Sequence, residues 1–213
     1  FSGAAPLGQE LEDAARSRLG CYVRQGYGMT EAAPATHIVP YDVAIKGEVK
    51  QSVGTLVPGM ECKIVDTSTG KACGINERGE ICLKGPNIMK GYLNKPEANK
   101  ESFDEEGFYK TGDVGYVDDA GLYYVVDRVK ELIKVKGFQV PPAELEAALL
   151  GFDKIADAAV IGLPDEKLGE VPKAYVVKQA GHEDLTAKAV AEFLAGRVAE
   201  YKRIDEERVE FVE

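Results

Sequence analysis

The sequence contains only two histidines and four cysteines, and it has no tryptophan. None of the cysteines, which are Cys21, Cys62, Cys73 and Cys82, belongs to a C-x-x-C pair. The usual zinc sites need closely spaced cysteine and histidine ligands, so such a site is excluded. We expect all four cysteines to be reduced thiols, as in a cytosol-like compartment.

Long apolar runs and positive charge are also scarce. No apolar run approaches the ~18 residues that a membrane-spanning helix needs, and no signal peptide is visible. Acidic residues outnumber basic ones by 36 to 26, so the net charge is -10, which argues against nucleic-acid binding. We expect a cytoplasmic protein without a membrane span, or a peroxisomal one if a targeting signal follows Glu213.

The residues that are present predict a mixed α/β fold. Hydrophobic residues make up 45% of the chain, which is enough for the cores of one or two domains. A helix is predicted over residues 7–19, because four apolar side chains recur on one face: Leu7, Leu11, Ala15 and Leu19. Short strands and turns follow from about residue 52 to 126, including a hairpin turn at residues 118–121.

The pattern changes near Asp127, after which helices and strands mix. Pro142 opens a predicted helix, and Thr186 is placed to cap another. We therefore expect two domains, residues 1–126 and residues 127–213. Because the chain starts without methionine and both of its ends are strand-like, we expect it to be an excerpt of a longer protein.

A glycine-rich loop combines several groups that suit a nucleotide: Gln25-Gly26-Tyr27-Gly28-Met29-Thr30-Glu31. The glycines let the backbone approach a ligand closely, and the tyrosine between them offers a face for a base. Thr30 supplies a hydroxyl for a phosphate oxygen, and Glu31 a carboxylate suited to Mg²⁺. The alternative is an ordinary glycine-rich turn. The loop is not a dinucleotide fingerprint, because Glu31 stands at the third glycine position.

A second candidate site is the segment Tyr109-Lys110-Thr111-Gly112-Asp113. The carboxylate of Asp113 could accept hydrogen bonds from both hydroxyls of a ribose. The alternative is that Asp113 only caps a turn.

A third candidate is a group of cations in an otherwise acidic chain. Alternation predicts an extended segment with four of them on one side: Arg128, Lys130, Lys134 and Lys136. The alternative is a solvated edge strand, in which lysines prevent edge-to-edge pairing.

Together these segments resemble the adenylate-forming superfamily of acyl-CoA synthetases, adenylation domains and luciferases. Five segments occur in the family order: residues 2–7, 25–31, 109–113, 127–130 and 134–140. The resemblance covers the whole chain. The amino-acid sequence of the last segment and of the predicted helix after it is most similar to 4-coumarate:CoA ligases. It implies that residues 1–126 are the C-terminal part of the AMP-binding domain. Residues 127–213 would be the small mobile domain, truncated before the adenylating lysine.

The resemblance also implies roles for single residues. Nine would bind the nucleotide: Gln25, Gly26, Tyr27, Thr30, Asp113, Arg128, Lys130, Lys134 and Gln139. Ala4 and Gly26 would line the acyl-adenylate pocket. Glu31 would hold Mg²⁺, and Asp127 would be the hinge of the small domain.

The resemblance further implies a thiol substrate, because Lys136 and Gly137 match positions that meet coenzyme A. The phosphate loop of the family should precede Phe1, and its adenylating lysine should follow Glu213. We therefore expect no catalytic residue within the chain, and no adenylation by the chain alone.

The expected function of the whole protein is that of an acid–thiol ligase. It would use ATP to activate a carboxylic acid, such as a 4-coumarate-like aromatic acid, as an acyl-adenylate, and would transfer the acyl group to coenzyme A. The alternatives are a luciferase-like monooxygenase, a fatty acyl-CoA synthetase and a non-catalytic adenylate-binding fragment.

Overall fold

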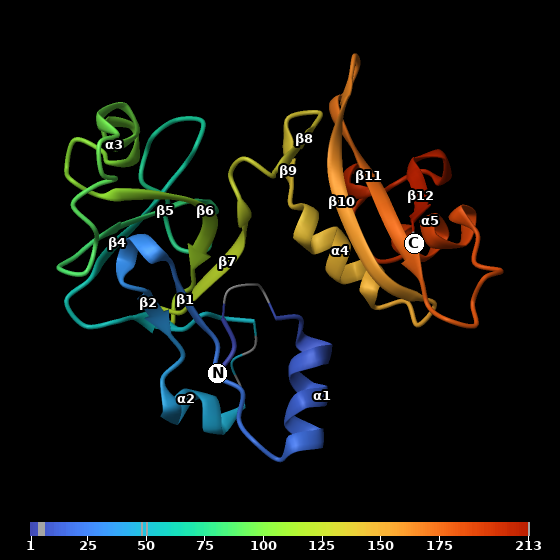
Figure 1. Ribbon diagram of the computed structural model, residues 1–213, viewed down its shortest axis with the longest axis horizontal. Helices are drawn as coiled ribbons and strands as arrows, with labels where there is room; N and C mark the ends of the chain where they lie inside the picture. Colours follow the sequence, from blue (N-terminus) through green and yellow to red (C-terminus); the bar gives the residue numbers. More distant parts are fainter. Residues whose placement is uncertain (4–6, 48, 50, 213) are drawn as a thin grey trace. The chain divides into compact units, whose positions relative to one another are not determined.

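The computed structural model describes residues 1–3, 7–47, 49 and 51–212, and these form two compact units, Phe1–Val129 and Lys130–Glu213. Helices and sheets mix in both units, so the predicted α/β class is confirmed (Figure 1). The domain boundary that we expected after Val126, next to the proposed hinge at Asp127, remains a prediction. The four cysteines are free, and in the described part of the chain no helix is long and apolar enough to cross a bilayer.

The first unit opens with helix α1 (Gln9–Leu19), which Gly20 ends in a left-handed conformation with φ of 62°. A three-stranded antiparallel sheet follows, with the order β1 (Gly26–Gly28), β2 (Ala35–Ile38) and β3 (Thr55–Leu56). Between these strands lie the 3-10 helix η1 (Thr30–Ala32) and helix α2 (Tyr41–Lys46).

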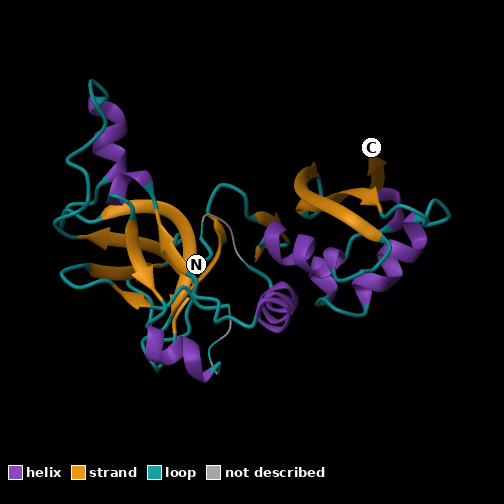
Figure 2. Ribbon diagram, turned by 60° about the horizontal axis from the view of Figure 1, so that its bottom comes forward, coloured by secondary structure: helices purple, strands orange, loops and turns teal. Residues whose placement is uncertain are grey.

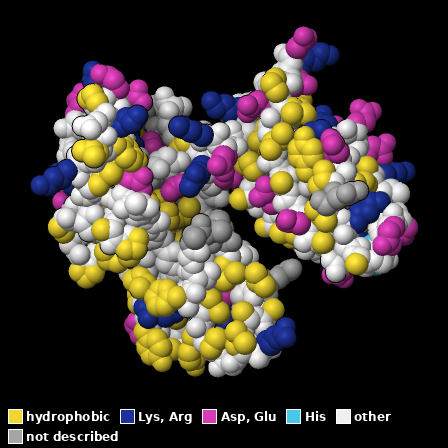
Figure 3. Space-filling view, in the orientation of Figure 1, with side chains coloured by type: hydrophobic (Ala, Val, Ile, Leu, Met, Phe, Trp, Pro, Cys, Tyr) yellow, Lys and Arg dark blue, Asp and Glu magenta, His cyan; other side chains and the backbone are white. Residues whose placement is uncertain are grey.

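The predicted first helix is present, but its apolar face is largely exposed. Helix α1 begins at Gln9 rather than residue 7, and Leu11 and Leu19 are 63% and 70% exposed. The buried side chain is Glu12, which accepts a hydrogen bond from Gln25 at 3.0 Å. Hydrophobic side chains are accordingly visible on the surface of the α1 and α2 region (Figure 3). The side of α1 that faces the rest of the unit therefore carries Glu12, and the apolar stripe identified by periodicity lies elsewhere on the helix.

The second sheet of this unit is antiparallel, with strands in sequence order: β4 (Glu61–Val65), β5 (Gly79–Lys84), β6 (Tyr109–Val117) and β7 (Tyr123–Arg128). Helix α3 (Pro96–Ser102) lies in the connection between β5 and β6. The core of this sheet is centred on three buried side chains, those of Ile64, Ile81 and Leu83. The predicted hairpin turn joins β6 to β7, and Asp118 closes it by accepting two backbone hydrogen bonds.

The second unit contains a five-stranded sheet with the order β10-β11-β8-β9, and its fifth strand, β12, pairs parallel to β11. Its strands are β8 (Ile133–Val135), β9 (Phe138–Val140), β10 (Ile155–Asp165), β11 (Gly169–Lys178) and β12 (Val209–Val212). The helices are α4 (Pro142–Leu150), α5 (Ala187–Ala195), η2 (Glu200–Lys202) and η3 (Glu206–Arg208).

Helices α4 and α5 lie on one side of this sheet and build the core against it (Figure 2). Leu145, Leu149, Val190 and Leu194 are fully buried there. The predicted helix cap is confirmed, since the Thr186 hydroxyl accepts a hydrogen bond from the Ala189 amide at 3.3 Å.

The predicted single extended segment of cations is wrong. Strand β7 ends at Arg128 and β8 begins only at Ile133, with a turn between them. Lys136 has a left-handed φ of 50° in the turn between β8 and β9. Burial of Ile133 and Val135 orients β8, which leaves Lys134 exposed. Alternation therefore holds within β8 but does not extend to all four cations.

Candidate nucleotide site

The glycine-rich loop forms the tight β1–β2 hairpin and the 3-10 helix η1. A Cβ atom on Gly28 would lie 2.1 Å from the carbonyl oxygen of Pro34, so the hairpin itself requires glycine there. A Cβ on Gly26 would lie 3.2 Å from the carbonyl oxygen of His37. Close packing within the hairpin therefore explains Gly28 without a ligand.

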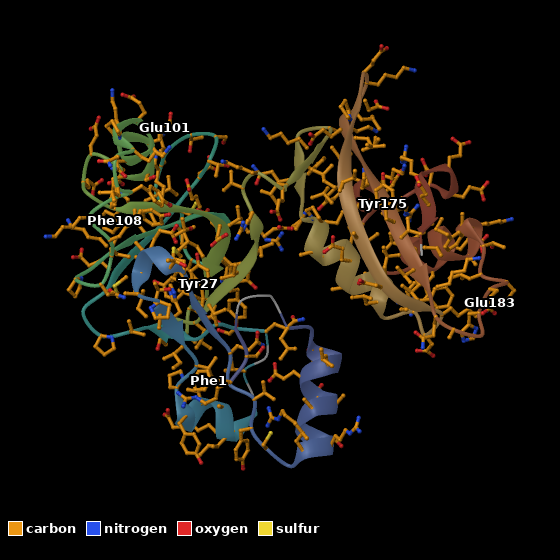
Figure 4. The ribbon with its side chains drawn as sticks, in the orientation of Figure 1. Phe1, Tyr27, Glu101, Phe108, Tyr175 and Glu183 are labelled. Carbon is orange, nitrogen blue, oxygen red and sulfur yellow. The ribbon has the colours of Figure 1, made fainter. Side chains whose placement is uncertain are left out.

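Tyr27 and Asp113 are brought together from distant parts of the sequence. Tyr27, which is labelled in Figure 4, lies on β1. Its hydroxyl donates a hydrogen bond to Asp113 Oδ2, which links β1 to β6. Burial, followed by the charge of Asp113, raises the pKa of Tyr27 well above its usual value, so the phenol stays protonated and remains a donor.

The other oxygen of Asp113 faces a cation. Arg128 lies directly opposite Asp113 in the β6–β7 ladder, and its Nε is 3.6 Å from Asp113 Oδ1. Burial raises the pKa of Asp113, while the bond from Tyr27 and the charge of Arg128 oppose this shift. Three predicted nucleotide residues thus meet around one carboxylate.

The ring of Tyr27 packs near a buried histidine, His37. His37 is 1% exposed, and its ring lies 5.7 Å from that of Tyr27 and 4.4 Å from that of Tyr123. Burial lowers the pKa of His37 to about 4, so the ring is neutral near pH 7. It therefore supports Tyr27 as an uncharged packing partner.

Gln25 and Thr30 lie at opposite ends of the loop. Gln25 is 7% exposed, its side-chain amide nitrogen donates to Glu12 on α1, and its backbone carbonyl oxygen accepts from the Val39 amide at 3.0 Å. Thr30 is exposed at the start of η1, where its hydroxyl is accessible. Their roles toward a nucleotide remain predictions.

Glu31 is held by a tyrosine that the sequence analysis missed. Its Oε1 accepts a hydrogen bond of 2.8 Å from the hydroxyl of Tyr92, which in turn lies 3.2 Å from the hydroxyl of Tyr109. Tyr92 stands in the irregular connection after β5, where no periodic pattern marks a side chain as buried or as facing the loop. Only the folded chain shows that this connection returns to Glu31.

The donor set around Glu31 suits a magnesium ion that is bound mainly by its substrate. Among the described residues, no group of three or more histidine, cysteine or acidic side chains gathers to hold a metal. Magnesium commonly uses one or two carboxylates and takes its remaining ligands from phosphates and water. A single carboxylate beside an exposed Thr30 hydroxyl fits that pattern.

The remaining predicted residues lie exposed in turns and strands, except for Asp127 and Ala4. In the second unit, Lys134 and Gln139 lie opposite each other in the β8–β9 ladder, and Lys136 and Gly137 form the turn that joins these strands. Lys130 is exposed before β8. In the first unit, Asp127 is buried, and its Oδ1 accepts the Arg128 amide at 2.7 Å. Ala4 lies outside the described residues.

A cavity of about 390 Å³ opens beside Lys136 within the second unit. Tyr201, Arg203 and Arg208 line it together with two acidic side chains, those of Glu200 and Asp205. Arg208 is paired with Asp205, whereas Arg203 is exposed. With three basic and two acidic side chains, the lining carries a small excess of positive charge.

Comparisons with known proteins identify the family of the chain. Residues 1–93 match the family described as AMP-binding enzyme, and residues 144–213 match the AMP-binding enzyme C-terminal domain. The chain belongs to the AMP-binding enzyme family. The predicted superfamily membership is thereby confirmed.

Curated relatives of this family member are named as 4-coumarate-CoA ligases. The chain is 55% identical to 4-coumarate-CoA ligase 2 from Narcissus pseudonarcissus, over 100% of this chain and 37% of that protein. It is 53% identical to 4-coumarate--CoA ligase 2 from Oryza sativa subsp. japonica, over 96% of this chain and 36% of the relative. The chain thus spans little more than a third of the length of the curated relatives it matches.

Solved structures of AMP-binding enzymes share the fold. ATP-bound MatB from Rhodopseudomonas palustris superposes with a TM-score of 0.89 at 35% identity, covering 99% of this chain and 41% of that one. The o-succinylbenzoate CoA synthetase of Bacillus subtilis, in complex with its acyl-adenylate intermediate, gives 0.86 at 36% identity over the same shares.

Proposed function

We propose that the whole protein is an ATP-dependent acid–CoA ligase that acts on a 4-coumarate-like aromatic acid. The observation that carries the proposal is the carboxylate of Asp113, held between Tyr27 and Arg128 in a chain of this family. The choice of acid is supported by the names of the relatives, at about half identity over the residues they share.

In the first half-reaction the first unit binds and orients the nucleotide. Asp113 accepts the ribose hydroxyls, since a carboxylate offers two oxygens with free lone pairs in addition to the contact with Tyr27. Tyr27 and Gly26 border the adenine, and Thr30 reaches a phosphate oxygen. Glu31 would hold Mg²⁺, and the bound ion would supply positive charge that neutralises the phosphates.

The second half-reaction uses the second unit, which turns about Asp127. Such hinge motions of a small domain can bring a different set of residues to one site. Lys136 and Gly137 then meet coenzyme A. The positive charge of Lys136 and Arg203 beside the cavity supports this assignment, because coenzyme A carries several phosphates.

The test is a panel of acids with the full-length protein, with AMP release and thioester formation followed separately. We expect both products with 4-coumarate and related cinnamates, at a higher kcat/KM than with fatty acids. AMP release with no thioester from any acid would overturn the ligase assignment. A preference for fatty acids would favour a fatty acyl-CoA synthetase, and light emission with luciferin a luciferase-like enzyme.

A further inference from the structure

The connection between β5 and β6 returns to the nucleotide loop through Tyr92. Its hydroxyl lies 2.8 Å from Glu31 Oε1 and 3.2 Å from the hydroxyl of Tyr109, the first residue of β6. Tyr92 therefore bridges the carboxylate of the loop and the strand that carries Asp113. Neither the sequence motifs nor the family resemblance assigned a role to Tyr92.

The direction of these hydrogen bonds follows from proton bookkeeping. A tyrosine hydroxyl has one proton, and an ionised carboxylate can only accept. Tyr92 must therefore donate to Glu31, so the proton between the two tyrosines belongs to Tyr109. Burial raises the pKa of Tyr109, which keeps it protonated. The chain thus runs from Tyr109 through Tyr92 to one oxygen of Glu31.

Tyr92 is held by its backbone as well as by its hydroxyl. The side chain of Asn99, on α3, accepts from the Tyr92 amide at 2.6 Å and donates to its carbonyl oxygen at 2.9 Å. Gly91 has a φ of 144°, and a Cβ atom there would lie 2.9 Å from the Asn99 side chain. The same connection binds the loop again, since the Met89 amide donates to the carbonyl oxygen of Glu31 at 2.8 Å. The position of Tyr92 is therefore fixed by hydrogen bonds to its backbone from Asn99, and the segment around it is bonded to the loop.

We propose that Tyr92 is a positioning residue that fixes the Glu31 carboxylate for the magnesium-bound nucleotide. This inference rests on the proposed function. The hydrogen bond from Tyr92 uses Oε1, so Oε2 is the oxygen that would bind the ion. Partners that orient a ligating carboxylate commonly change metal affinity about 10- to 100-fold when they are removed.

The test measures ATP binding by calorimetry on the full-length protein, with Mg²⁺ and with a chelator in its place. The dissociation constant in chelator, divided by the dissociation constant with Mg²⁺, reports the part of the affinity that depends on magnesium. We expect Tyr92→Phe to reduce this ratio about tenfold and to leave binding in chelator unchanged. The matched control is Tyr124→Phe, which removes a tyrosine–carboxylate bond of 3.1 Å to Asp118 on the distant hairpin and should change neither constant.

Glu31→Gln separates this inference from the function on which it rests. If Tyr92 acts through Glu31, Tyr92→Phe adds no further loss in the Glu31→Gln background, because the two changes remove one unit. A magnesium-dependent ratio that survives Glu31→Gln would overturn the metal assignment itself. A ratio that falls with Glu31→Gln and stays at the wild-type value with Tyr92→Phe would overturn the role of Tyr92 alone. An equal loss with Mg²⁺ and with chelator would also overturn it, since that pattern reports general disruption.

Discussion

Replacing Asp113 with alanine tests the contact that carries the proposed function. In the folded chain, this carboxylate accepts the hydrogen bond of Tyr27 and faces Arg128 at 3.6 Å. The substitution removes both contacts and leaves the largely buried Tyr27 hydroxyl without its acceptor. Asp113→Asn is the matched control, because its amide oxygen has the same shape and can still accept from Tyr27.

The magnitude can be worked out contact by contact. The Arg128 side chain is 70% exposed, so its ion pair with Asp113 contributes at most about 1 kcal/mol. A hydrogen bond to a charged group contributes about 1.5–3 kcal/mol, and a stranded buried donor costs a similar amount. Burial of the charge, which raises the pKa of Asp113, offsets part of these contributions. We therefore expect Asp113→Ala to lower the free energy of unfolding by about 2–3 kcal/mol and Asp113→Asn to change it by about 1 kcal/mol or less in either direction.

Nucleotide binding provides a second readout of the same residue. If Asp113 accepts the ribose hydroxyls, both variants should bind ATP about 10- to 100-fold more weakly in the full-length protein. Urea unfolding measures the first effect and calorimetry the second. Unchanged ATP affinity in both variants would refute the ribose role, and equal stability of wild type and Asp113→Ala would refute the importance of the bond to Tyr27.

Three further predictions concern other residues. Because burial lowers the pKa of His37 to about 4, the unfolded chain takes up a proton first as pH falls. The stability that neutral His37 contributes is present above pH ~6.5 and is lost toward pH ~4, by up to about 3 kcal/mol. The free energy of unfolding, measured against pH, should lack this decrease in His37→Gln. Leu194→Ala should cost about 2–5 kcal/mol in urea unfolding because Leu194 is fully buried, whereas Leu150→Ala, at a 47% exposed position, should cost less than about 1 kcal/mol. Lys136→Ala should slow thioester formation more than adenylate formation in single-turnover assays, and equal slowing of both steps would contradict its role toward coenzyme A.

Local features were predicted where neighbouring residues determine them. The hairpin at Asp118 depends on a four-residue turn whose carboxylate bonds to its own backbone. The cap at Thr186 depends on a hydroxyl within reach of the amide three residues later. Such signals are complete within a few residues, so they can be interpreted without knowing the fold.

Features that depend on a distant partner could not be predicted in the same way. The stripe containing Leu11 was real, but the burial of Glu12 depended on Gln25, which comes later in the chain. The alternating cations followed strand geometry only within β8, because the turn before Ile133 and the left-handed Lys136 end that regularity.

The candidate site divides along the same line. The sequence by itself determined which chemical groups are present, since Tyr27, Glu31, Asp113 and Arg128 stand in recognisable segments, and their order was enough to indicate the AMP-binding enzymes. Only the tertiary structure decided that Tyr27 donates to Asp113 and that Tyr92 reaches Glu31, across 86 and 61 residues. The reason is physical: a motif specifies side chains over a few neighbouring positions, whereas a hydrogen bond depends on distance and direction in space, which sheet pairing and loop placement establish.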